Sequence, residues 1–309
     1  MNAVVNAAGT WMFNNRTHGE LKWTTIETEH FNIHYHQNLD EIALQGASIA
    51  EQIRPTIMKQ MGLESLPTLD IIFTAEDEVL NGFAVPANYT IIWVDQNDAA
   101  LWTGDEKWLR TVLAHELQHL VYFNTVKGPW WLPEPMNSLV HGTPAWIVEG
   151  IAEYFTEEWR PFRYELSHRY HVLRNTVHKI QDPHNDGYSK SLYFADRFGD
   201  STISKILNHR NKLKFLDFKE SFKKHTGITL KQFNEDWRCQ MNTFYFSQRS
   251  QKERLEDAGV IRKLPIKRVL SFDYFQDTSK VAMITRLSKG QYDLSLSLIH
   301  ISEPTRRPI

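Results

Sequence analysis

Residues 108–123 read Trp-Leu-Arg-Thr-Val-Leu-Ala-His-Glu-Leu-Gln-His-Leu-Val-Tyr-Phe, the most strongly helical pattern in the chain. The leucines recur every three or four residues, which predicts a helix with a buried apolar face. They are Leu109, Leu113, Leu117 and Leu120. Ionisable side chains on a helix that is buried on most sides need a chemical reason, so this segment is a candidate site.

His115 and His119 lie four residues apart, so a helix places both imidazoles on one face, where they can bind one metal ion. Glu116 is turned away from that face, so its carboxylate lies beside the metal and not on it. That position suits a base acting on metal-bound water. Two packed histidines and a surface glutamate would give the same pattern, so the interpretation needs a second motif.

Residues 146–155, Trp-Ile-Val-Glu-Gly-Ile-Ala-Glu-Tyr-Phe, supply that motif. Glu149 and Glu153 share one face of a second helix, whose apolar neighbours predict that it is largely buried. Two histidines and one glutamate, with a position open to water, form a known catalytic zinc set. In that set Glu153 would hydrogen-bond a ligand imidazole and fix its tautomer. Solvated glutamates on an amphipathic helix are the simpler alternative.

His-Glu-x-x-His followed by Trp-x-x-Glu-Gly-x-Ala-Glu-Tyr resembles the gluzincin metallopeptidases, the peptidase MA-like domain. The resemblance covers about residues 23–250, with the two metal motifs specific and the rest loose. It implies an α+β, two-lobed zincin-like domain, with a small mixed sheet and the active-site helix in the first lobe and helices in the second. It also implies a hydrolase that cleaves peptide bonds by Glu-assisted attack of a zinc-bound water. One Zn²⁺ per chain would be bound by His115, His119 and Glu149, with Glu116 as general base.

The group that stabilises the oxyanion is less clearly marked in the sequence. Gluzincins often use a tyrosine or histidine of the second lobe, which makes Tyr188 the candidate, with ordinary packing as its alternative. His171, His178 and His184 rank below it. The extended stretch 83–94 could bind an extended peptide as an added strand, with Gly82, Phe83 and Ala84 as its substrate-binding residues. The Gly-x-Met-Glu-Asn motif of aminopeptidases is missing, which favours an endopeptidase.

Periodicity predicts the other elements of the first 250 residues. Strands are expected at 30–36 and 69–74, and helices at 40–61, 145–160 and through most of 165–250. Pro55 should bend or restart its helix, and Gly62 should end it. Turns are expected at Asn81-Gly82, 182–183, 185–187 and Gly199, and a long loop at 124–144. His30, His34 and His36 share a strand face and could bind a metal, although exposed strand histidines are more often just solvated.

The chain changes in character after residue 250. A lead (1–22) and the peptidase domain (23–250, lobes about 23–125 and 145–250) are followed by a charged linker at 251–265. Three β-rich runs at 269–275, 281–287 and 292–299 resemble one incomplete blade of a TolB-like β-propeller, placed at 266–300. The remaining residues, 301–309, fit no strand and are expected to be a non-native or disordered tail.

Composition excludes several classes of protein. The 309 residues include 35 Lys and Arg and 37 Asp and Glu, so a net charge of −2 gives no case for nucleic acid as a partner. Cys239 is the single cysteine, which rules out an intrachain disulfide and a cysteine metal cluster. The sequence contains no run of about 18 apolar residues, so it predicts no membrane-spanning helix.

The sequence leaves two alternatives open, one for the location of the protein and one for its function. The first residues lack the basic and apolar regions of a signal peptide, whereas the resemblance suggests an exported or periplasmic protein. The partner of the peptidase domain would be a peptide or protein substrate. The alternative function is a non-catalytic scaffold that binds a protein partner through the propeller. The intact Glu116 favours the enzyme, because a non-catalytic zinc site does not need a base.

Overall fold

The computed structural model describes residues 19–76, 81–94, 107–126, 128, 141–156, 162–177, 182–210, 217–252, 269–275, 280–288, 291–298 and 305–308. The chain divides into two compact units, Met1–Gln248 and Arg249–Ile309. Most of the predicted lead, loop and linker, together with His178, lies outside the described residues. The described part combines helices with two small sheets, so the α+β class is confirmed.

The first unit contains a mixed sheet with the strand order β1-β2-β3-β5-β4. The outer pairs β1/β2 and β4/β5 are antiparallel, and the central strands β2, β3 and β5 run parallel. The strands are β1 (Trp23–Glu27), β2 (Phe31–His36), β3 (Leu69–Thr74), β4 (Asn81–Val85) and β5 (Tyr89–Trp93). β4 therefore lies at an edge of this sheet, as Pro86 in the following turn predicts.

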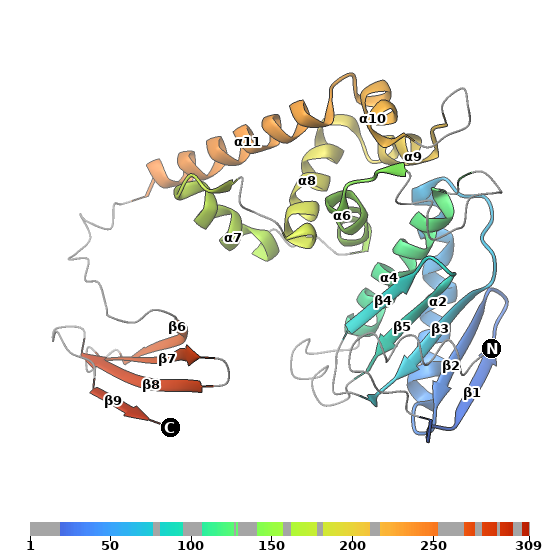
Figure 1. The fold of residues 1–309 in the computed structure, drawn as a ribbon, viewed down its shortest axis with the longest axis horizontal. Coiled ribbons are helices and arrows are strands. Elements are labelled where there is room, and N and C mark those ends of the chain that lie inside the picture. Colours follow the sequence, from blue (N-terminus) through green and yellow to red (C-terminus); the bar gives the residue numbers. More distant parts are fainter. Residues whose placement is uncertain are drawn as a thin grey trace. The chain divides into compact units, whose positions relative to one another are not determined.

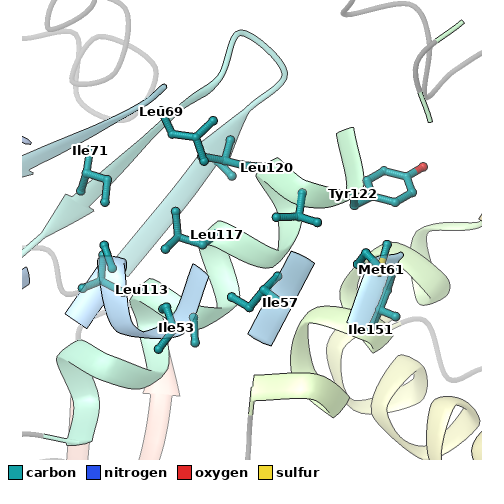
Figure 2. Packing of buried hydrophobic residues seen from close by; sticks show 14 of the residues in the cluster. Ile53, Ile57, Met61, Leu69, Ile71, Leu113, Leu117, Leu120, Tyr122 and Ile151 are labelled. Atoms are coloured by element: carbon teal, nitrogen blue, oxygen red, sulfur yellow. The ribbon is translucent and has the colours of Figure 1, made fainter. Parts of the chain in front are cut away.

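Two long helices, α2 (Asp40–Met61) and α4 (Lys107–Thr125), cover one face of the sheet (Figure 1). Alternate strand residues such as Ile71 and Phe73 point into this core, whereas Ile72 belongs to a separate cluster on the other face. The four leucines of α4 are all at most 5% exposed, so the predicted apolar face is confirmed. Figure 2 shows side chains of α2, α4 and β3 pointing toward one another. A fully buried leucine stabilises the fold by about 1.5–3 kcal/mol.

Every described element from residue 145 to 250 is a helix (Figure 1). These helices are α6 (Ala145–Thr156), α7 (Phe162–Leu173), α8 (Pro183–Phe198), α9 (Ser201–Asn208), α10 (Phe218–Thr226) and α11 (Leu230–Ser250). Aromatic rings bind them together: Phe233 of α11 stacks on Trp146 of α6 at 5.5 Å and contacts Phe194 of α8 and Phe222 of α10. No helix among the described residues has the length and apolarity needed to cross a membrane.

Three local predictions are wrong. Pro55 does not restart its helix: α2 is one continuous helix up to its left-handed C-cap at Gly62, and its buried face continues on both sides of the proline. Asn81 and Gly82 belong to strand β4 and form no turn, because they pair with Trp93 and Ile92 of β5. Residues 185–187 lie inside α8, whose start is set by the N-cap Asp182 and by Pro183 in its first turn.

The second unit contains a four-stranded antiparallel sheet with the order β6-β7-β8-β9. Its strands are β6 (Val269–Phe275), β7 (Lys280–Ser288), β8 (Gln291–Leu298) and β9 (Thr305–Pro308). The prediction that the last residues fit no strand is wrong, because Thr305–Pro308 pairs with residues 293–296 of β8. The run adds a fourth strand beside β8 to the three that the sequence predicts.

His168 of α7 makes the helical part of the first unit sensitive to acid. The ring is fully buried, Nδ1 donates to the Tyr164 carbonyl at 2.9 Å, and Nε2 has no hydrogen-bond partner among the described residues. Burial lowers the pKa of His168 to about 4. Protonation would leave an unpaired charge near the Lys190 ammonium.

We expect the free energy of unfolding to fall as the pH drops from about 6.5, the pKa of histidine in the unfolded chain, toward 4. The unfolded state binds the proton first in this window, and the loss from this one ring is up to about 3 kcal/mol. Urea unfolding at pH 7, 5.5 and 4.5 measures the slope, which His168→Gln should reduce. An equal slope in both proteins would contradict the assignment.

Candidate metal centre

The imidazoles of His115 and His119 meet on one face of α4, as the spacing predicts. Their Nε2 atoms lie 3.0 Å apart, and the rings are nearly perpendicular with centroids 4.7 Å apart. Both side chains are largely buried, at 15% and 10% exposure. Two nitrogens that converge so closely in a buried position are well placed to share one cation.

Glu149 of α6 brings a carboxylate to the same point. Its Oε2 lies 3.5 Å from His115 Nε2 and 3.3 Å from His119 Nε2. Ligand atoms about 2.0–2.1 Å from a tetrahedral zinc lie about 3.3 Å from one another. The three atoms therefore have the mutual separations that a tetrahedral zinc ion requires.

Glu153, one helical turn after Glu149, lies behind His115. Its Oε1 is 3.9 Å from His115 Nδ1, within ion-pair distance, and its side chain is 1% exposed. A carboxylate on the far nitrogen of a ligand imidazole orients the ring and increases its basicity. The 3.9 Å separation is longer than a hydrogen bond, so the predicted hydrogen bond between Glu153 and a ligand imidazole stays a prediction.

Glu116 is buried between α4 and the edge strand β4. Its carboxylate accepts a hydrogen bond from the backbone N–H of Ala84. Gly82 lies against the same side chain, because a Cβ atom there would come within 2.6 Å of Glu116 Cγ and Oε1. Gly82 and Ala84 thus face Glu116, whereas Phe83 packs on the opposite side with Ile72 and Ile91. Of the three predicted substrate-binding residues, two border the candidate base.

The charges of the cluster depend on its burial. Burial lowers the pKa of His115 to about 4 and raises the pKa of Glu116 to about 7. Burial acts to raise the pKa of Glu149 as well, but hydrogen bonds with His115, His119 and His184 hold it far below its ordinary range. Glu149 is therefore a carboxylate and His115 a neutral imidazole, and these are the forms that bind metal ions.

His184 joins this cluster, although the sequence ranks it below Tyr188. Its Nε2 lies 3.1 Å from Glu149 Oε2, and its ring is nearly parallel to that of His115, with centroids 6.0 Å apart. His184 also forms a group with His115 and Glu149 in which the ligand atoms all lie within 4.8 Å of one another. The N-cap and proline at 182–183 could have revealed it, because they place His184 in the first turn of a helix.

Two glycines allow α6 and α8 to approach closely enough for this contact. A Cβ at Gly150 would come within 2.5 Å of the Gly187 carbonyl oxygen, and one at Gly187 within 2.4 Å of the Trp146 carbonyl oxygen. Gly150 follows Glu149 directly, and Gly187 lies three residues after His184. The point where α6 and α8 cross at Gly150 and Gly187 therefore sets the distance between the Glu149 and His184 side chains.

The other histidines and the predicted tyrosine lie in different surroundings. Tyr188 is 1% exposed, and its ring centroid lies 5.8 Å from that of Tyr164. The imidazole of His171 contacts Thr176 Oγ1 at 2.9 Å. The oxyanion role of Tyr188 stays a prediction.

His30, directly before β2, and His34 and His36 of β2 have separate partners. His30 contacts Glu51 of α2 at 2.8 Å, His34 contacts Asp70 of β3 at 3.1 Å, and His36 accepts the backbone N–H of Ala75. They form no metal-binding group among the described residues. Their polar contacts attach the strand to its neighbours.

Gly82→Ala should impair the centre more than the fold. The new methyl group would displace the Glu116 carboxylate, which is the flexible end of a side chain and can move. We expect the peptide hydrolysis that the resemblance implies to fall by about 10-fold or more, because small misplacements of a reacting group are costly, while the melting temperature changes little. Gly19→Ala is the matched control, because no atom lies within 4 Å of the added methyl group there. Unchanged activity in Gly82→Ala would contradict the predicted role of this contact.

Neither the models of known protein families nor the curated proteins include a match to this chain, so its interpretation rests on its own residues.

Proposed function

We propose that the chain is a zinc-dependent peptidase of the gluzincin type. One observation supports this most directly: His115 Nε2, His119 Nε2 and Glu149 Oε2 lie within 3.5 Å of one another beside the buried carboxylate of Glu116. The first three are the ligand set of a catalytic zinc site, and the fourth is the base that such a site needs.

The residues present fit a zinc ion. Nitrogen and carboxylate ligands suit Zn²⁺, and the Nε2 atoms of His115 and His119 both approach the Glu149 carboxylate. When bound, the ion lowers the pKa of its water and polarises the substrate carbonyl. His115, His119 and Glu149 would bind it, with Glu153 orienting His115.

Glu116 moves the proton in this proposal. Its carboxylate accepts a proton from the attacking water and passes it to the leaving amine. A pKa raised by burial to about 7 suits both transfers near neutral pH. The Ala84 N–H and the close contact with Gly82 keep the carboxylate in place.

Strand β4 would position the substrate. It is an edge strand of the described sheet, and an extended peptide can add to such an edge through backbone hydrogen bonds. Because Gly82 and Ala84 face Glu116, a peptide along β4 would pass close to the base. An extended mode of binding favours cleavage within a chain, that is, endopeptidase activity.

The finer fold assignments belong to the same proposal. The mixed sheet with α2 and α4, together with the helices α6–α11, would be the two lobes of a zincin-like domain. The sheet β6–β9 would be a TolB-like blade. It exposes large apolar side chains, including Phe272 at 69% and Leu270 at 52%. This exposure favours a second function, in which the blade binds a protein partner.

Metal analysis tests the proposal. Elemental analysis of purified protein should find about one zinc per chain, and His119→Ala should lose it because one of three converging ligands is removed. His171→Ala is the matched histidine control and should keep the metal. A peptide library then tests cleavage. If the wild-type protein takes up no zinc at neutral pH, the peptidase proposal fails.

A further inference from the structure

His184 approaches the centre from a different helix than the predicted ligands. It lies in the first turn of α8, which the Asp182 carboxylate caps by accepting the backbone N–H groups of His184 and Asn185. Its Nε2 lies 3.1 Å from Glu149 Oε2, a separation also found between two ligands of one tetrahedral ion. The side chain is 47% exposed, so it is the most accessible member of the cluster.

His184 also resembles His115 in the surroundings of its second nitrogen. His115 Nδ1 faces the Glu153 carboxylate at 3.9 Å, and His184 Nδ1 faces the Asp182 carboxylate at 3.7 Å. In both rings the nitrogen near a carboxylate points away from the centre, and Nε2 points to Glu149 Oε2. A carboxylate at the far nitrogen is the usual companion of a metal-binding imidazole.

We propose that His184 is a fourth protein ligand, so that three imidazoles and the Glu149 carboxylate close the coordination sphere in the substrate-free protein. Four-coordinate zinc with four protein ligands has no position for water, whereas a catalytic site needs one. His184 must therefore leave its position to water before a peptide can be hydrolysed. This inference rests on the proposed zinc centre and adds a regulation to it.

The exposed position of His184 makes such a displacement feasible. The other imidazoles are largely buried on α4, whereas His184 can rotate toward solvent without leaving the helix. Asp182 can keep a hydrogen bond to the backbone of α8 in either position. A peptide entering along β4 would then displace His184, and the vacated position would be open to the attacking water.

Imidazole nitrogen resonances count the ligands directly. In protein labelled with ¹⁵N-histidine, adding Zn²⁺ should shift the Nε2 signals of three imidazoles in wild type and of two in His184→Ala. His171→Ala should still show three. Competition with a chelator should show that His184→Ala binds zinc at least about 10-fold more weakly than wild type. Acetohydroxamate, a small zinc-binding probe, should bind His184→Ala more tightly because its position is open.

The outcomes separate the two proposals. If zinc shifts only two imidazoles in wild type and in His184→Ala alike, His184 is no ligand, and the peptidase proposal stands. If zinc shifts none in wild type, both fail. Asp182→Asn is a second variant, because it keeps an N-cap acceptor and removes only the charge beside Nδ1. It should weaken zinc binding in the same direction, and unchanged affinity would count against the inference even if His184→Ala does not fold.

Discussion

Glu116→Gln should abolish peptide hydrolysis and leave zinc binding intact. The amide has nearly the shape of the carboxylate, and its oxygen can still accept the Ala84 N–H, so the contact with β4 survives. It cannot accept a proton from water. Loss of a general base typically lowers the rate by about 10²–10⁴-fold. The turnover of a peptide found in the library screen, measured together with zinc content, tests this expectation.

The control for Glu116→Gln makes the same chemical change elsewhere. Glu41 lies exposed in the first turn of α2, and Glu41→Gln should retain full activity. If Glu116→Gln keeps more than a small fraction of wild-type activity, Glu116 is not the base. If neither wild type nor variant ever cleaves a peptide although zinc binds, the scaffold alternative gains.

The sequence predicts those parts of the centre that depend on local spacing. His115 and His119, like Glu149 and Glu153, are neighbours on a single helix, so their relation follows from helical geometry alone. The resemblance implies that the two helices bring their ligands together, and in the structure Glu149 Oε2 lies 3.5 Å from His115 Nε2 and 3.3 Å from His119 Nε2. The sequence ranks His184 low because its contact with Glu149 depends on how α8 packs against α6, and no local sequence pattern encodes that packing.

In α8 and α2 the local composition favours a structure other than the one that forms. Asn185-Asp186-Gly187 has the composition of a turn, yet Gly187 is a helical residue at a crossing where backbone atoms need the space of a side chain. Pro55 is a helix breaker by itself, yet α2 continues because Ile53, Ile57 and Met61 bury one continuous face. In both cases tertiary packing decides against local preference.

Gly187→Ala should separate α6 from α8 and weaken the centre without touching any ligand. Its methyl group would lie 2.4 Å from the Trp146 carbonyl oxygen and 2.8 Å from the Gly150 nitrogen. Both are backbone atoms of a helix and cannot move alone, so the helices must part. Such overpacking costs about 1–3 kcal/mol, against a gain of about 1 kcal/mol in helix propensity.

The same movement would carry His184 away from Glu149, so zinc affinity should fall together with stability. Urea unfolding of the metal-free protein measures the first effect, and chelator competition measures the second. Asp196→Ala, at an exposed position on the same helix, is the matched control and should change stability by less than about 0.5 kcal/mol. If Gly187→Ala binds zinc and unfolds as wild type does, the crossing does not set the geometry of the centre. If stability falls while zinc affinity is kept, the crossing supports only the fold, because the ligands then find their places without it.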